Sequence, residues 1–219
     1  MNSAKHVSIS ATKYDRAACA VGVVHLGFGA FHRAHQAVYI DDYMDKTGDL
    51  NWGIAAVNLR PDDNDFFQIA MNDIARHDGY FLKSFSPDGH VELRRVRAHV
   101  QFLDWGSQAT DAEDVLTLEN VHLVTITVTE SGYYTDPNGD LNFDDPIMAA
   151  EFGGAEPQSI YGYLRRALRA RMRATGAPLT IACCDNIRQN GKMLRRNLLD
   201  YSARCNDPEL GRCYGHIGC

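Results

Sequence analysis

The chain has 219 residues, of which 45% are hydrophobic and 23% charged, and its formal net charge is −6. This composition excludes a wholly disordered chain and a collagen-like repeat, and the acidic balance argues against a dedicated nucleic-acid-binding protein. No apolar run approaches the roughly 20 residues that span a bilayer, and the first twenty residues lack the apolar core of a signal peptide. We therefore expect no nucleic-acid partner, no membrane partner and a cytoplasmic location.

Strand-like and helix-like segments alternate in the first part of the chain. Residues 20–27 and 52–59 are apolar, as in strands that are buried on both faces. Helical periodicity follows each of them, ending at Gly48 in the first case and covering 62–77 in the second. Two β-prone runs, 79–85 and 90–103, then flank a turn signal at 86–89, which predicts a hairpin.

The second part continues the alternation. Residues 111–118 are a short helix candidate, 121–129 form the strongest strand of the chain, and 159–174 are helical. A buried strand at 178–184 and a helix at 191–204 follow. This order predicts an α/β fold with a doubly wound, mostly parallel sheet and an inserted hairpin. Because such sheets bind ligands at the carboxyl ends of their strands, the residues that follow each strand are the candidates for function.

The first strand runs into Gly27-Phe28-Gly29 and then into a helix. Two glycines at this point permit a tight turn and the close approach of a pyrophosphate, and the start of a helix offers free backbone N–H groups. The match to a dinucleotide-binding fingerprint is partial, because His32 stands where a third small residue is expected. The pattern alone leaves a dinucleotide site and an ordinary glycine turn equally open.

The second strand is followed by Arg60, Asp62 and Asp63, near the usual position of a ribose-binding acid. A carboxylate there would bind the ribose hydroxyls and repel a 2′-phosphate, which favours NAD over NADP. Both Asp residues could instead only cap the helix that follows. Arg60 keeps NADP open, since an arginine near this point can accept the 2′-phosphate.

Polar residues also follow the two later strands. Glu130 ends the strand at 121–129 and could bind substrate or relay a proton, although a solvated loop glutamate is the simpler reading. Asn186 follows Asp185 after the strand at 178–184 and could donate a hydrogen bond to a developing oxyanion. An Asx turn or a helix cap explains the same pair equally well.

Two further clusters favour structural interpretations. His32 and His35 lie three residues apart, and a buried or phosphate-facing polar cluster is favoured over a metal pair because no further ligands lie nearby. The helix at 159–174 carries many arginines, for which a solvated helix face is favoured over an RNA-binding stripe. These arginines are Arg165, Arg166, Arg169, Arg171 and Arg173.

Four blocks in the same order carry a resemblance to a known family. They are HLGFGAFHRAHQAVYIDD, WGIAAVNLRPDD, TITVTESGYY and CCDNIRQNG. Together they resemble the polyol-specific long-chain dehydrogenases, the mannitol dehydrogenase family, over nearly the whole chain. The resemblance implies a Rossmann-type domain that binds NAD, and a reversible hydride transfer between a polyol secondary alcohol and NAD that gives a ketose, with no metal.

The resemblance also implies roles for individual positions. The pyrophosphate loop would consist of Gly27, Phe28, Gly29, Ala30 and Phe31, and the acids near the adenosine ribose would be Asp63 and its neighbour Asp62. Glu130 matches the glutamate near the substrate and its proton path, and Asn186 matches the asparagine that polarises the reacting oxygen.

The substrate expected from the resemblance is a polyol such as D-arabinitol or mannitol. The blocks around 85–89, 132–134 and 159–162 are most similar to the arabinitol 4-dehydrogenase branch. The segment 57–59 also occurs in the fructuronate reductases, so a fragment of a fructuronate or tagaturonate reductase is an alternative.

The end of the chain departs from the family pattern. The family's catalytic lysine belongs to a helical domain after the fourth block, and no K-x-x-x-x-N-x-x-H pattern occurs in these 219 residues. We expect an N-terminal segment at 1–19, an NAD-binding Rossmann domain at 20–212 and an off-pattern tail at 213–219. A frameshift or premature stop is favoured over a separate catalytic chain and over a zinc site. That zinc site would use Cys205, Cys213, His216 and Cys219. A module that binds NAD without turnover is therefore an alternative function.

Overall fold

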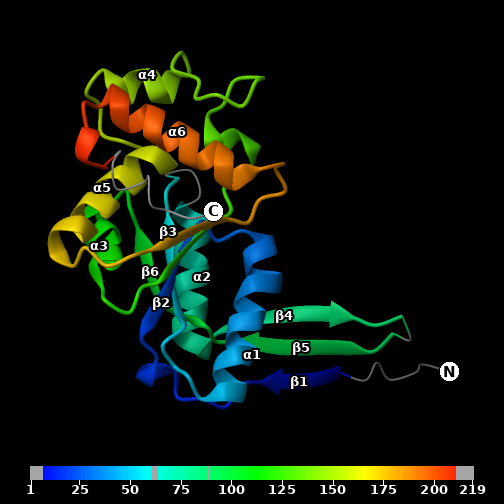
Figure 1. Ribbon diagram of the computed structural model, residues 1–219. Helices are drawn as coiled ribbons and strands as arrows, with labels where there is room; N and C mark the ends of the chain where they lie inside the picture. Colours follow the sequence, from blue (N-terminus) through cyan, green and yellow to red (C-terminus); the bar gives the residue numbers. More distant parts are fainter. Residues whose placement is uncertain (1–6, 61–63, 88, 211–219) are drawn as a thin grey trace.

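The computed structural model describes residues 7–60, 64–87 and 89–210 (Figure 1). Its strands are β1 (Val7–Ala11), β2 (Val21–Leu26), β3 (Gly53–Asn58), β4 (Tyr80–Phe85), β5 (Val91–Val96), β6 (His99–Asp104), β7 (Leu123–Ile126) and β8 (Thr180–Cys183). Its α-helices are α1 (Ala37–Thr47), α2 (Asn64–His77), α3 (Ala109–Asp114), α4 (Pro146–Phe152), α5 (Ile160–Ala174) and α6 (Asn190–Arg204). A π-helical turn, His32–Gln36, precedes α1, and short 3₁₀ turns include Val115–Thr117 and Glu130–Tyr133. None of the described helices is long and apolar enough to cross a membrane.

Five parallel strands form the main sheet, in the order β6-β3-β2-β7-β8. The chain builds outward from β2 in both directions, so the strand order reverses between β2 and β7. This confirms the predicted doubly wound sheet. In such a sheet the crevice at the reversal point, outside the carboxyl ends of the strands, is the usual place for a ligand.

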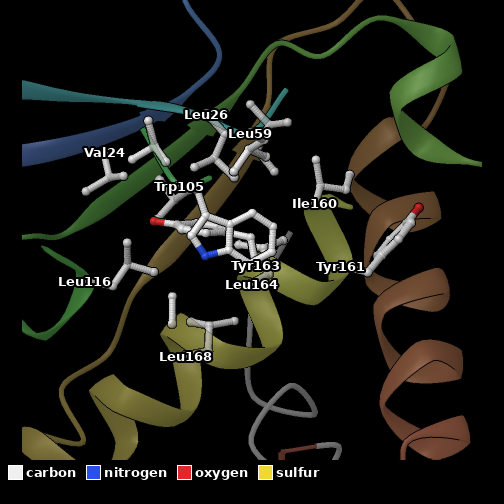
Figure 2. Packing of buried hydrophobic residues seen from close by; sticks show 14 of the residues in the cluster. Val24, Leu26, Leu59, Trp105, Leu116, Ile160, Tyr161, Tyr163, Leu164 and Leu168 are labelled. Atoms are coloured by element: carbon white, nitrogen blue, oxygen red, sulfur yellow. The ribbon is translucent and has the colours of Figure 1, made fainter. Parts of the chain in front are cut away.

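Helices cover both faces of this sheet. Val23 and Ile54 pack against residues of α1, and Ala56 packs against residues of α2. The opposite face carries Val24 and Val57 and belongs to a larger cluster with residues from α3, α5 and α6. Figure 2 shows part of this cluster, including Trp105 and Tyr163, whose rings meet edge to face at 5.4 Å. Alternate residues of each strand therefore serve two separate apolar layers, as the continuous hydrophobicity of the strands predicted.

The predicted hairpin belongs to a second, smaller sheet of three strands in the order β1-β5-β4. β4 and β5 pair antiparallel around the predicted turn, where Gly89 has a φ of +86°. The run predicted as one strand at 90–103 divides at Arg97, whose backbone N–H donates to the carboxylate of Asp41 over 3.0 Å instead of to a neighbouring strand, and β6 then enters the main sheet. The sequence did not predict β1, which pairs parallel with β5. We call the β1-β5-β4 sheet the arm, because it extends away from the rest of the molecule in Figure 1.

One expectation for α5 was wrong. Arg171 is not on a solvated helix face, since only 2% of it is exposed. It lies on the same helix face as Leu164 and Leu168, in step with the helical repeat of the buried residues. Arg165 and Arg169 both pair with the buried carboxylate of Asp207, so they too have specific partners.

Candidate functional site

A cavity of about 220 Å³ lies at the carboxyl edge of the main sheet, where the strand order reverses. The segments that line it follow β2, β3 and β7 and precede α5. The lining residues are Gly27, Phe28, Gly29, Asn58, Leu59, Arg60, Phe66, Phe67, Thr127, Val128, Thr129, Gly132, Tyr134, Gln158 and Ile160. This is the position in which an α/β sheet of this kind binds its ligand.

Gly27 is required by the fold itself. Its φ is +105°, which side chains with a Cβ rarely adopt, and an added Cβ would lie 2.6 Å from the carbonyl oxygen of Thr127. Its N–H donates to the carbonyl of Val57 over 2.9 Å. The turn is therefore fixed between β3 and the end of β7.

Gly29 has a different reason to be glycine. An added Cβ would meet no protein atom within 4 Å, and its φ lies outside the left-handed region. Its carbonyl accepts from the N–H of Arg33 over 3.1 Å, so it lies at the start of the helical segment. Nothing in the described protein explains the missing side chain, whereas a ligand that approaches the backbone there would. Ala30 and Phe31 follow it as exposed residues and do not line the cavity.

Phe28 anchors the turn between the two glycines. The centre of its ring lies 6.1 Å from that of Phe67 and 5.4 Å from that of Phe102, in edge-to-face geometry with both. The predicted loop therefore combines a buried aromatic anchor with an exposed glycine at the start of a helix.

The end of β3 contributes Asn58 and Arg60. Asn58 is buried and donates to the carboxylate of Asp104 and to the carbonyl of Arg60, each over 2.9 Å. The Arg60 guanidinium lies at the cavity and donates to the hydroxyl of Ser131 over 3.3 Å. Asp62 and Asp63, the predicted ribose acids, lie outside the described residues.

Asp185 joins the loops after β7 and β8. Its carboxylate accepts from the N–H groups of Val128 and Thr129 over 3.0 and 3.3 Å, and from the hydroxyl of Tyr133 over 2.7 Å. The N–H of Thr127 still donates to the carbonyl of Leu26 in β2 over 3.1 Å, but those of Val128 and Thr129 bind this side chain instead of a neighbouring strand, so the pairing ends earlier than predicted. Thr129 is left with a φ of +65°.

Glu130 and Asn186 are both exposed on these two joined loops, next to Thr129 and Asp185 respectively. Neither of them lines the cavity. The fold therefore places the two predicted catalytic residues on neighbouring loops at its rim.

Behind the glycine turn lies a cluster of three buried histidines, His25, His32 and His99. The rings of His25 and His32 stack at 3.5 Å, and Nε2 of His32 lies 2.8 Å from Nε2 of His99. Nδ1 of His32 donates to Oε1 of Gln36 over 2.8 Å, so in its neutral form its Nε2 accepts from His99. The sequence favoured a buried or phosphate-facing polar cluster at His32, but it did not predict the contact with His99, which lies 67 positions away.

Burial shifts all three titrations in the same direction. It lowers the pKa of His32 to about 4 and lowers the pKa of His25 and His99 well below the usual value of 6.5. The neighbouring cations Arg33 and Arg16 add to this shift, because a second positive charge beside them is unfavourable. The cluster is therefore neutral near pH 7.

Within the described part of the chain, no group of three or more His, Cys, Asp or Glu residues is arranged to hold a metal ion. His35 is exposed and contacts Phe31, whereas His32 is buried. Three of the four residues considered for a zinc site, Cys213, His216 and Cys219, lie outside the described residues.

Comparisons with known proteins agree on one family. Residues 21–210 match the mannitol dehydrogenase Rossmann domain. A mannitol 2-dehydrogenase from Cereibacter sphaeroides is 34% identical over 204 residues, which are 93% of this chain and 42% of that protein. A D-arabinitol 4-dehydrogenase from Klebsiella pneumoniae is 34% identical over 178 residues, which are 81% of this chain and 38% of that protein.

Solved structures give the same result. A Pseudomonas fluorescens mannitol 2-dehydrogenase, in a ternary complex with NAD and D-mannitol, superposes with a TM-score of 0.84 at 29% identity. The match covers 96% of this chain and 43% of that one. A D-sorbitol dehydrogenase in substrate-free form gives a TM-score of 0.81 at 29% identity, covering 94% and 42%. The fold is therefore Rossmann-like, and the chain spans less than half the length of these relatives.

Proposed function

The chain belongs to the mannitol dehydrogenase family, and on that premise we propose that the cavity at the carboxyl edge of its sheet binds NAD. The observation that carries the proposal is the contrast between the two glycines of the turn. The fold accounts for Gly27, whereas Gly29 leaves open space at the start of a helix. Backbone N–H groups at such a position suit the negative charge of a pyrophosphate.

A second observation supports the fit. The hydroxyl of Thr127 is buried and has no hydrogen-bond partner among the described residues, although Thr127 lines the cavity. A buried polar atom without a partner is costly, and a polar ligand would remove that cost. Arg60 adds a positive charge at the same cavity.

Each predicted residue then has a role in the proposed site. Residues 27–31 hold the pyrophosphate through their backbone, and Asp62 and Asp63 hold the adenosine ribose. Bound NAD supplies the acceptor for a hydride from a secondary alcohol. Glu130 accepts or relays the proton of a substrate hydroxyl, and Asn186 donates a hydrogen bond to the reacting oxygen.

The proposed substrate of the complete reaction is a polyol, D-arabinitol or mannitol, which is oxidised to a ketose. The names of the relatives support this class, since both mannitol 2-dehydrogenases and a D-arabinitol 4-dehydrogenase are among them. We further propose that these 219 residues bind NAD(H) without turnover on their own. Reduction of NAD by the purified chain in the presence of either polyol would contradict this.

Substitutions at the two glycines test the cofactor site. Gly29→Val should weaken NADH binding about tenfold or more, because its side chain fills the space assigned to the pyrophosphate, while the melting temperature stays unchanged. Gly27→Ala should instead destabilise the fold by about 2 kcal/mol or more, through its positive φ and the contact with Thr127. Titration of protein fluorescence with NADH and thermal unfolding separate the two effects. Wild-type NADH affinity in Gly29→Val would show that the pyrophosphate lies elsewhere.

The ribose assignment has its own test. Asp63→Ala should reduce the preference for NADH over NADPH, because the carboxylate that repels a 2′-phosphate is removed. Asp65→Ala, in the first turn of α2, is the matched control and should leave the preference unchanged. Equal preferences in wild type and Asp63→Ala would assign cofactor choice to another residue.

A further inference from the structure

The arm carries several large apolar side chains on the face that points to solvent. Its register places side chains from all three strands on one face, which we call the outer face of the arm. Nine residues share this face: Val7, Ile9, Ala11, Phe81, Lys83, Phe85, Val91, Leu93 and Arg95. Large apolar side chains on it are strongly exposed, at 56% for Val7, 71% for Ile9, 49% for Phe81 and 70% for Phe85.

The opposite face of the arm is polar near the hairpin turn, whereas its residues closer to the main sheet, Tyr80, Leu82 and Val96, pack into the apolar cluster that includes residues of α1. Ser10 donates to Glu92 over 2.9 Å, and Ser8 and Ser84 lie beside them on that face. Arg94 reaches from it to Asp41 and Asp42 of α1, over 3.2 and 2.6 Å. A two-sided sheet ordinarily covers its apolar face and leaves the polar one in water. Near the hairpin turn the arm does the reverse, which indicates that its outer face is built to be covered.

A second copy of the arm is a poor occupant for this face. Its two charged residues, Lys83 and Arg95, are both basic, and none of its nine residues is acidic. Two outer faces stacked on each other would bring these cations together. The charge favours a partner that presents apolar side chains together with carboxylates.

The solved relatives contain additional chain outside the region that they share with this protein, and that part could be such a partner. At least 94% of this chain superposes on 42–43% of theirs, so more than half of each relative lies beyond the shared domain. We propose that the outer face of the arm is the docking surface for this additional part of the family's chain, whether it is continuous with these residues or supplied separately. The proposal does not depend on NAD binding.

A chimera tests this directly. Residues 1–210 are fused to the part of the Pseudomonas fluorescens enzyme that follows its matched region, and thermal unfolding is compared with that of the 219-residue chain. The pair Ile9→Lys and Phe85→Lys should lower the melting temperature of the chimera by about 5 °C or more, because it places charges in a covered apolar contact. The same pair should leave the 219-residue chain unchanged. Ser8→Lys with Ser84→Lys, on the opposite face, is the control and should affect neither protein.

Equal effects of the Ile9 and Phe85 pair on both proteins would overturn the proposal. If the chimera does not unfold cooperatively, the two pieces are co-expressed as separate chains. The proposal would then be overturned if the two chains do not co-purify, or if they co-purify equally well when the first chain carries Ile9→Lys. Sedimentation velocity of the 219-residue chain tests whether a second copy covers the face instead. A dimer that dissociates in the Ile9→Lys variant would assign the face to a second copy and overturn the proposal.

Discussion

Replacement of Arg171 by leucine should cost about 3–5 kcal/mol of unfolding free energy, a large share of the roughly 5–15 kcal/mol that stabilises an ordinary domain. Arg171 is almost fully buried in α5 and donates hydrogen bonds to five backbone carbonyls. These carbonyls belong to Leu116, Leu118, Val121, Ala177 and Pro178. Leucine supplies no donor, so the carbonyls of Leu116 and Val121, whose hydrogen bonds to Arg171 are fully buried, would lose this partner in the interior.

The position of these carbonyls explains the size of the effect. Val121 and Pro178 lie shortly before β7 and β8, so one guanidinium fixes the entry of both strands into the sheet. Lysine is a poor replacement, because a single ammonium cannot reproduce a planar group with five donors. Arg171→Lys should therefore recover only part of the loss.

Urea unfolding followed by circular dichroism measures this prediction. Arg173→Leu is the matched control, because Arg173 is exposed two residues further along the same helix, and it should change the unfolding free energy by less than about 0.5 kcal/mol. Equal unfolding free energies of Arg171→Leu and Arg173→Leu would contradict the prediction and show that water replaces Arg171 as the partner of these carbonyls.

The second large effect is a loss of stability at acidic pH. We expect the unfolding free energy to fall steeply as the pH drops below 6.5, because three imidazoles that are neutral in the fold become protonated in the unfolded chain. Their folded pKa values are depressed, to about 4 for His32 and well below 6.5 for His25 and His99. Stability from these groups is therefore complete above pH 6.5 and is lost as the pH falls toward the folded pKa values. Each group contributes up to about 1.4 kcal/mol per pH unit, and the three together up to about 4.

Urea unfolding at pH 7.5, 6.5 and 5.5 tests this expectation. His99→Gln keeps a donor for His32 but removes one titrating group, so the slope below pH 6.5 should fall by about 1.4 kcal/mol per pH unit. His122→Gln, at an exposed position, serves as the control and should retain the wild-type slope. A His99→Gln profile parallel to wild type would mean that carboxylates dominate the acid response.

Local patterns predicted those parts of the site that depend on a few neighbouring residues. Gly27 and Gly29 were identified because a buried strand, a glycine turn and a helix follow one another directly. The end of α1 at Gly48 followed from the same kind of short-range pattern. Helix α4 was not predicted, since its seven residues are too short for a clear periodicity.

The roles of polar side chains in the interior were much harder to predict. Asp185 was interpreted as an orienting or capping residue, yet its carboxylate binds the loop after β7, 52 to 57 positions away. Arg171 was assigned to solvent because arginine is seldom buried. In both cases partners are backbone groups outside the element that carries the side chain. A pattern within one helix or strand therefore cannot predict the contact.

The sequence by itself determined the alternation of most strands and helices, the parallel sheet and the glycine turn at its carboxyl edge, because periodicity and turn chemistry act over a few residues. Only the tertiary structure decided which polar groups meet. His25 and Thr125 lie 100 positions apart, and His32 and His99 lie 67 apart, yet each pair is in hydrogen-bonding contact. It also decided that the apolar side of the arm faces outward, since alternation along a strand defines two faces but does not say which one the rest of the chain will cover.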